Sequence, residues 1–148
     1  MSGIDRSGQC LCGAVSFAAR GVRRDYGACH CGMCQHWTGT AFVAVSVPEA
    51  DITWTGESLI RRYQSSSWAE RAWCDRCGGH LWYRVTAEGP HKGNYEVPIG
   101  LFDDTSGFDL RGEIYVDMAP DSFAIAGEHT RMTAEEARRR FSYEESPS

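Results

Sequence analysis

The sequence lacks an excess of positive charge and has no long apolar run. Lys and Arg total 15 against 20 Asp and Glu, for a net charge of −5 at pH 7, so no broad cationic surface is available to neutralise nucleic-acid phosphates. The longest apolar run, Ala41–Val45, is too short to cross a bilayer. Residues 1–8 lack the basic segment and following apolar segment of a secretion signal. These absences predict a cytoplasmic protein that binds neither nucleic acid nor membrane.

Size and composition are those of an ordinary globular protein. The chain has 148 residues, of which 42% are hydrophobic and 24% are charged, and this length is typical of one domain. We therefore expect a single domain over residues 1–148, with the short Glu- and Ser-rich segment Ser142–Ser148 as a flexible tail. Nothing in the residue pattern requires or excludes a dimer, so the oligomeric state stays open.

Short segments rich in β-branched and aromatic residues recur between turn signals, which predicts a mostly β fold. A helix is expected only near the C-terminus, where Thr133 and Glu136 form a capping-box pattern ahead of Ala137–Phe141. The expected strands are Ala14–Ala18, Ala41–Val47, Ile52–Thr55, Leu59–Gln64, Arg71–Trp73, His80–Val85, Tyr95–Leu101, Glu113–Val116 and Phe123–Ile125.

The seven cysteines are the strongest chemical signal in the sequence. In a reducing compartment, closely spaced cysteines indicate metal binding or thiol chemistry rather than disulfides. A C-x-C pair places both thiols on one side of an extended segment, because side chains alternate there. The C-D-R-C-G-G stretch suits a tight turn around an ion, since glycines accept a positive φ. The clusters are Cys10 with Cys12, Cys29 with Cys31 and Cys34, and Cys74 with Cys77.

Seven cysteines divide naturally into a group of four and a group of three. Structural zinc sites take four protein ligands, whereas catalytic sites take three and keep one position open. We expect the first and last pairs to share a structural zinc that joins distant parts of the chain, and the middle group to bind a second zinc with a position free for water or substrate. The four-cysteine cluster is then Cys10, Cys12, Cys74 and Cys77, and the cysteine trio is Cys29, Cys31 and Cys34.

Other outcomes stay open for the cysteine trio. A histidine can complete a closed site, and His36 is a better candidate than His30, whose side chain should point away from its two cysteine neighbours. His80 and His91 can also approach in space. Without a metal, the three thiols would suit redox chemistry. The competing functions are therefore a zinc enzyme, a non-catalytic zinc-stabilised binding module and a thiol redox protein.

The cysteine clusters and their flanks resemble one family, the glutathione-dependent formaldehyde-activating enzymes, which share the centromere protein V type of domain. The first pair resembles G-x-C-x-C-G-x-V-x-F, the trio resembles C-H-C-x-x-C-x-x-x-x-G, and the last pair resembles Y-x-S through R-x-F-C-x-x-C-G. Later stretches resemble G-x-L-D and H-I-Y-V, with Glu113 in place of the family's His. The matching segments are Gly8–Phe17, Cys29–Gly39, Tyr63–Gly78, Gly100–Asp103 and Ile114–Val116.

The resemblance implies a β-tent fold of small antiparallel sheets held together by a four-cysteine zinc, with a catalytic zinc at the trio. The implied activity is that of a carbon–sulfur lyase of the S-(hydroxymethyl)glutathione synthase type, which adds glutathione or a similar small thiol to formaldehyde or a related aldehyde. Glutathione carries two carboxylates, so a basic side chain should lie near the site. Arg71, in the matched motif, is the candidate for substrate binding, and Arg61 and Arg62 are others.

Overall fold

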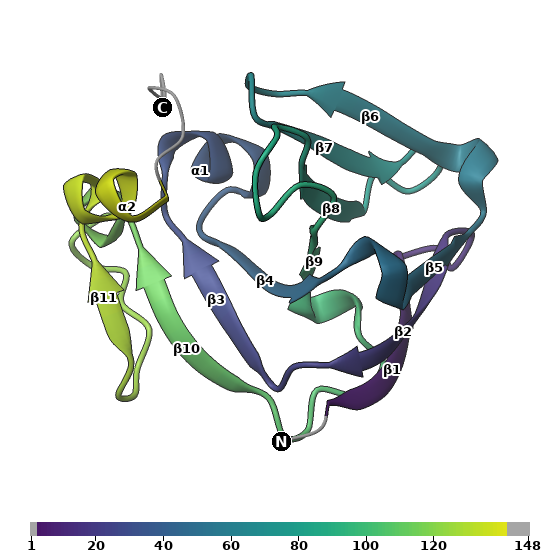
Figure 1. The fold of residues 1–148 in the computed structure, drawn as a ribbon, viewed down its shortest axis with the longest axis horizontal. Coiled ribbons are helices and arrows are strands. Elements are labelled where there is room, and N and C mark those ends of the chain that lie inside the picture. Colours follow the sequence, from purple (N-terminus) through teal and green to yellow (C-terminus); the bar gives the residue numbers. More distant parts are fainter. Residues whose placement is uncertain (1–2, 142–148) are drawn as a thin grey trace. The chain divides into compact units, whose positions relative to one another are not determined.

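A computed structural model describes residues 3–141 of the chain (Figure 1). These residues group into two compact units. Unit 1 contains the residues up to Arg24 and Val45–Phe108, and unit 2 contains Asp25–Ala44 and the residues from Asp109 onward. The expected tail, Ser142–Ser148, lies outside the described residues. That residues 1–148 form a single domain stays a prediction.

Unit 1 consists of antiparallel strands. The strand β2 pairs with β1 on one side and with β5 on the other. The strands β6 to β9 form a meander in the order β9-β8-β7-β6 (Figure 1). Three short 3-10 helices also lie in the unit: Glu49–Asp51 precedes β5, Glu57–Leu59 connects β5 and β6, and Ile99–Leu101 follows β9. The strands are β1 (Ile4–Gln9), β2 (Ser16–Val22), β5 (Ile52–Thr55), β6 (Ile60–Gln64), β7 (Ala69–Cys74), β8 (His80–Val85) and β9 (Tyr95–Pro98).

The core of unit 1 is built around aromatic rings. Trp82 is almost fully buried, and its ring lies 4.7 Å from that of Trp54 and 4.9 Å from that of Tyr95, measured between centroids. Phe17 extends the cluster, with its ring centroid 5.2 Å from Trp54 and 5.0 Å from Phe102. Offset and edge-to-face pairs at such separations stabilise a core beyond the burial of their area. Trp82 therefore fixes the centre of β8, one strand away from the cysteines that end β7.

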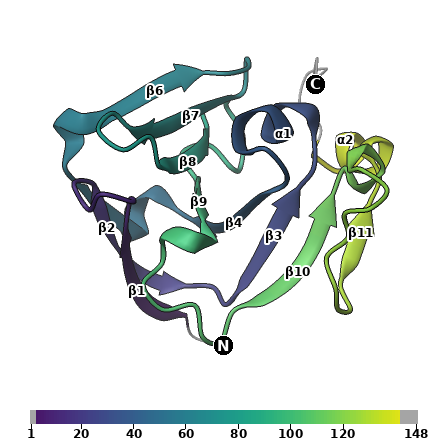
Figure 2. The same ribbon diagram turned by 180° about the vertical axis from the view of Figure 1, so that it is seen from behind.

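Unit 2 has four strands in the order β11-β10-β3-β4 (Figure 2). The pair β3–β4 is antiparallel, as expected, but β10 runs parallel to both β3 and β11. Parallel neighbours need long connections, and the chain between β3 and β10 is long enough to supply one. The strands are β3 (Asp25–Cys29), β4 (Phe42–Val47, whose last three residues belong to unit 1), β10 (Asp109–Ile114) and β11 (Thr130–Met132).

Two helices complete unit 2, together with a 3-10 turn at Val116–Met118. The helix α1 (Gly32–Thr38) begins after Cys31 and ends at Gly39, whose left-handed conformation (φ 94°) lets its N–H donate to the Gln35 carbonyl. The helix α2 (Ala134–Phe141) has the predicted capping box: the Glu136 N–H donates to Thr133 Oγ1 at 3.3 Å, and the Thr133 N–H donates to Glu136 Oε1 at 2.8 Å. The capping pattern in the sequence is thus confirmed.

The prediction of a mostly β protein with a short C-terminal helix is confirmed, with eleven strands in the described residues. One expected strand is wrong, because Phe123–Ile125 has no regular structure and follows a turn that the Phe123 N–H closes by donating to the Pro120 carbonyl. The strand of this region is β11 instead, and β1, β3 and α1 were not expected. Neither helix within residues 3–141 has the length and hydrophobicity needed to cross a membrane.

Candidate metal centres

The four-cysteine cluster is built from two tight turns in unit 1. Cys10 and Cys12 lie in the turn between β1 and β2, where the Gly13 N–H donates to the Cys10 carbonyl at 3.0 Å. Cys74 ends β7, and the Gly78 N–H donates back to its carbonyl at 2.8 Å with Gly78 at φ 78°. A positive φ at this position favours glycine, so the glycine after the last cysteine closes the turn. Each pair of thiols is thereby held by local backbone geometry.

The spacing of the four sulfurs fits a tetrahedral metal ion. Cys10 Sγ lies 3.7 Å from Cys12 Sγ, and Cys12 Sγ lies 3.9 Å from Cys74 Sγ. All four Sγ atoms lie within 4.8 Å of one another. A tetrahedron of thiolates at the zinc–sulfur distance of about 2.3 Å places its sulfurs about 3.8 Å apart. The donor set and its spacing therefore fit zinc.

Without a metal, the four thiols differ in their affinity for protons. Burial acts to raise the pKa of Cys77, but the backbone N–H of Gly79 and other hydrogen bonds outweigh it and lower the pKa to about 6. The pKa of Cys12 is raised to about 11, because burial and the neighbouring thiols outweigh the hydrogen bond from the Ala14 backbone. A metal ion would displace the protons that remain, since thiolate is the ligating form.

The cysteine trio lies in unit 2, where β3 leads into α1. Cys29 ends β3, Cys31 is the N-cap of α1, and Cys34 lies in its first turn. The three Sγ atoms lie within 4.8 Å of one another. The Cys34 N–H donates to Cys31 Sγ at 3.4 Å, so the cap itself orients one of the thiols. The trio can therefore offer three convergent sulfur ligands from one short segment.

The surroundings of the trio are partly buried and strained. Hydrogen bonds with the Cys31 and Cys34 thiols, together with burial, raise the pKa of Cys29 well above its usual range.

Tyr115 follows β10, whose last residue pairs with Cys29, and it has a φ of 61°. It is the sole non-glycine residue with a positive φ among the described ones. Such a conformation costs about 1–3 kcal/mol and is common at functional sites.

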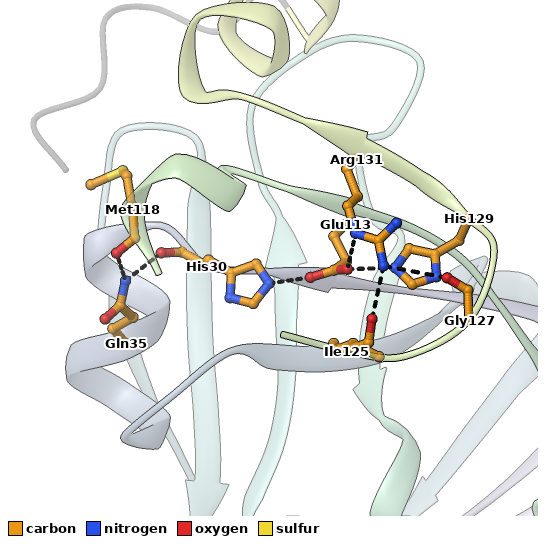
Figure 3. A network of polar contacts seen from close by, with 8 residues as sticks. All are labelled: His30, Gln35, Glu113, Met118, Ile125, Gly127, His129 and Arg131. Carbon is orange, nitrogen blue, oxygen red and sulfur yellow. Dashed lines mark hydrogen bonds and ion pairs between the residues drawn. The ribbon is translucent and has the colours of Figure 1, made fainter. Parts of the chain in front are cut away.

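No histidine nitrogen belongs to either cluster within residues 3–141. His30 contacts Glu113 (Figure 3), which agrees with the alternation of side chains that sets it apart from its cysteine neighbours. His36 is exposed on α1, and His91 is exposed in the loop before β9. His80 is half-buried on β8, where burial and the charge of Arg71 lower its pKa. A trio closed by a histidine therefore has no support from this geometry.

A buried polar network includes His30, the residue between Cys29 and Cys31 (Figure 3). His30 Nε2 is 2.6 Å from Glu113 Oε1, and the other carboxylate oxygen contacts His129 Nε2 and lies 3.4 Å from Arg131 Nε. Burial acts to raise the pKa of Glu113, but the hydrogen bonds from His129 and His30 prevail and lower it. The carboxylate is thus ionised and held from two sides. A cavity of about 280 Å³ opens beside the network, lined in part by Phe123.

The candidate arginines have different surroundings in unit 1. Only 5% of Arg71 is exposed, its Nε donates to Ser65 Oγ at 3.2 Å, and its guanidinium lies 5.0 Å above the centre of the Tyr83 ring. Arg61 pairs with Asp75 at 3.0 Å on the surface. Arg62 lies 3.6 Å from Glu70 and stacks over Trp82. All three arginines thus have structural partners, and the assignment of Arg71 to substrate binding stays a prediction.

Sequence reasoning missed the role of Glu113 and did not single out His129 and Arg131. His129 and Arg131 are two positions apart, so in an extended segment their side chains point the same way. That alternation was the available signal, but nothing in the sequence linked it to a glutamate 16 residues away. The pairing of β10 with both β3 and β11 brings the groups together.

Residues 5–118 match the family described as glutathione-dependent formaldehyde-activating enzyme, which is well over half of the chain. A protein of the fission yeast Schizosaccharomyces pombe, described as an uncharacterized lyase, is 29% identical over 129 residues. The aligned region covers 87% of this chain and 91% of the yeast protein. Both cysteine clusters lie inside the family match, whereas His129 and Arg131 lie beyond its end.

Proposed function

Because the chain belongs to the glutathione-dependent formaldehyde-activating enzyme family, we propose that it is a zinc-dependent carbon–sulfur lyase. Its reaction would join the thiol of glutathione, or of a similar small thiol, to formaldehyde or a related aldehyde. One carbon–sulfur bond forms and the thiol proton passes to the aldehyde oxygen, so no oxidant or reductant is needed. The yeast relative, which is described as a lyase, agrees with this reaction class.

The division of the cysteines into a group of four and a group of three carries the proposal. The four-cysteine cluster fits a closed structural zinc site, and the trio fits a site with one position left for a reactant. Cys29, Cys31 and Cys34 would hold a zinc ion, which would supply the positive charge that favours the ionised form of a substrate thiol. The chain's part is to converge three sulfurs from the β3–α1 segment and to keep them partly out of water.

Arg71 is proposed as the residue that binds a carboxylate of the thiol substrate. Its guanidinium can offer planar paired donors that match a carboxylate. The hydrogen bond to Ser65 and the packing on Tyr83 restrain the side chain, which lowers the entropy lost on binding. We further propose a cytoplasmic location, which the seven free thiols support.

The proposal is tested by measuring zinc per chain together with turnover. We expect two zinc ions per chain and a rate of adduct formation above that of the uncatalysed reaction. Cys31→Ser should keep the fold, lose about one zinc and lose turnover, whereas Met33→Leu on the same segment should behave as the wild type. A wild-type chain with a single tightly bound zinc and no turnover would instead identify a zinc-stabilised binding module.

A further inference from the structure

His30 connects the cysteine trio to the interior of unit 2. Its ring is 2% exposed, and the alternation of side chains along an extended segment places it on the opposite side from the thiols of Cys29 and Cys31. His30 lies between Cys29 and Cys31 on one stretch of backbone. A fixed His30 side chain therefore restrains the segment that carries two of the three thiols.

Glu113 is the group that fixes this ring. Its Oε1 lies 2.6 Å from His30 Nε2, and its Oε2 is occupied separately by His129 and Arg131 (Figure 3). Arg131 is itself anchored, since its Nη2 donates to the Ile125 carbonyl at 2.8 Å. The carboxylate is thus bound on both oxygens, by His30 directly after β3 and by His129 and Arg131 at the start of β11, and it cannot turn without breaking one set of contacts. Charge-assisted hydrogen bonds of this kind are about twice as strong as neutral ones.

The backbone of His30 is anchored independently of its ring. The His30 N–H donates to the Ile114 carbonyl at 3.0 Å, and its carbonyl accepts from Gln35 Nε2 at 2.6 Å. The same Gln35 nitrogen donates to the Met118 carbonyl at 2.8 Å. Loss of the Glu113 carboxylate would remove the side-chain restraint on this segment and leave only its two backbone hydrogen bonds. The expected effect is local to the trio rather than a loss of the fold.

We infer that Glu113 is a positioning residue that acts through His30 to hold the cysteine trio in a metal-binding arrangement. The inference rests on the proposed function, in that the trio binds zinc. A metal gains affinity when its ligands are already convergent, and loss of groups that orient a metal site typically costs 10–100-fold in affinity. Glu113, His129 and Arg131 do not belong to the group of ligand atoms at the trio, so their effect on metal binding is indirect.

The test measures the zinc affinities of both clusters in the full chain by competition with chelators of graded strength. Glu113→Gln should weaken zinc binding at the trio by about tenfold or more and leave the four-cysteine cluster unchanged. The matched control is Asp109→Asn, which removes an exposed carboxylate from the same strand and should change neither affinity. The four-cysteine cluster serves as an internal reference for folding in every variant.

Two further variants keep the inference open to contradiction if Glu113→Gln does not fold. His129→Gln removes one contact of the Glu113 carboxylate and should lower the zinc affinity of the trio by a few-fold. His30→Gln should have a higher zinc affinity at the trio than His30→Ala, because the glutamine amide can still donate to Glu113. Equal trio affinities across these variants and the wild type, with or without a lower melting temperature, overturn the inference. A wild-type chain that never binds a second zinc overturns the proposed function itself.

Discussion

Cys12 Sγ lies 3.9 Å from Cys74 Sγ, although 62 residues separate the two cysteines along the chain. The two turns that carry them belong to different sheets of unit 1, the β1–β2 pair and the β6–β9 meander. A metal bound between them would close a long loop, and that closure removes much of the conformational freedom of the unfolded chain. The four-cysteine cluster is therefore expected to control whether unit 1 folds.

Removal of one ligand from the four-cysteine cluster should unfold the protein. Zinc binding in small structural sites corresponds to about 10–16 kcal/mol, which is comparable with the 5–15 kcal/mol of net stability of a typical domain. We expect Cys74→Ser to show no cooperative thermal transition by circular dichroism, whereas the exposed neighbour Asp75→Asn should melt like the wild type. A Cys74→Ser chain with an unchanged melting temperature would contradict a structural role for the metal.

The trio should release its metal before the four-cysteine cluster does. A site with three protein ligands and an open position exchanges its ion more readily than a closed site with four. With a chelator of moderate strength, we expect zinc per chain to fall from about two to about one, turnover to be lost and the thermal transition to be nearly unchanged. Added zinc should restore turnover. Simultaneous loss of both ions with unfolding would show that the sites are not independent.

Substitution of Arg71 should weaken substrate binding. Hydrogen bonds to charged groups contribute about 1.5–3 kcal/mol, so loss of a paired contact to a carboxylate should raise KM for the thiol by roughly 10–100-fold. Arg71→Lys keeps the charge but not the planar donors, and we expect a higher KM with a smaller change in kcat. Arg61→Lys, which alters a surface pair with Asp75, is the control. An unchanged KM in Arg71→Lys would reject the assignment.

Stability should fall as the pH rises through the titration of Glu96. Burial raises the pKa of this carboxyl from 4.5 to about 7, although the hydrogen bond from Ser46 opposes the shift. Between these values the folded chain keeps a proton that the unfolded chain releases, so the free energy of unfolding decreases with pH and levels off above about 7.

The matching variant is Glu96→Gln, which stays neutral at every pH. Its stability relative to the wild type should increase from pH 5 to pH 8 by about 1–2 kcal/mol, a value that allows for the partial exposure of the side chain. Urea denaturation of both proteins at several pH values measures the difference directly. The titration of the cysteines contributes equally to both proteins, so it cancels in the difference. A stability difference that is constant with pH would mean that Glu96 titrates near its ordinary value.

Much of the fold could be predicted where the signal is local. The capping box at Thr133 and the strand β8 depend on residues close in sequence, and both are found where expected. The prediction failed at Phe123–Ile125, whose apolar residues resemble a strand but follow a turn that begins at Pro120 and form no ladder. The helix α1 was missed because a seven-residue helix has too few turns to display a hydrophobic period.

The sequence by itself determined that there are two groups of metal-type ligands, because the spacing of cysteines within a turn fixes which thiols face together. It also determined that His30 points away from the trio, since side chains alternate along an extended segment. Only the tertiary structure decided what His30 meets there. The parallel pairing of β10 with β3 and β11 places Glu113 between His30 and His129, and the partners of a strand depend on long-range packing that no local pattern encodes.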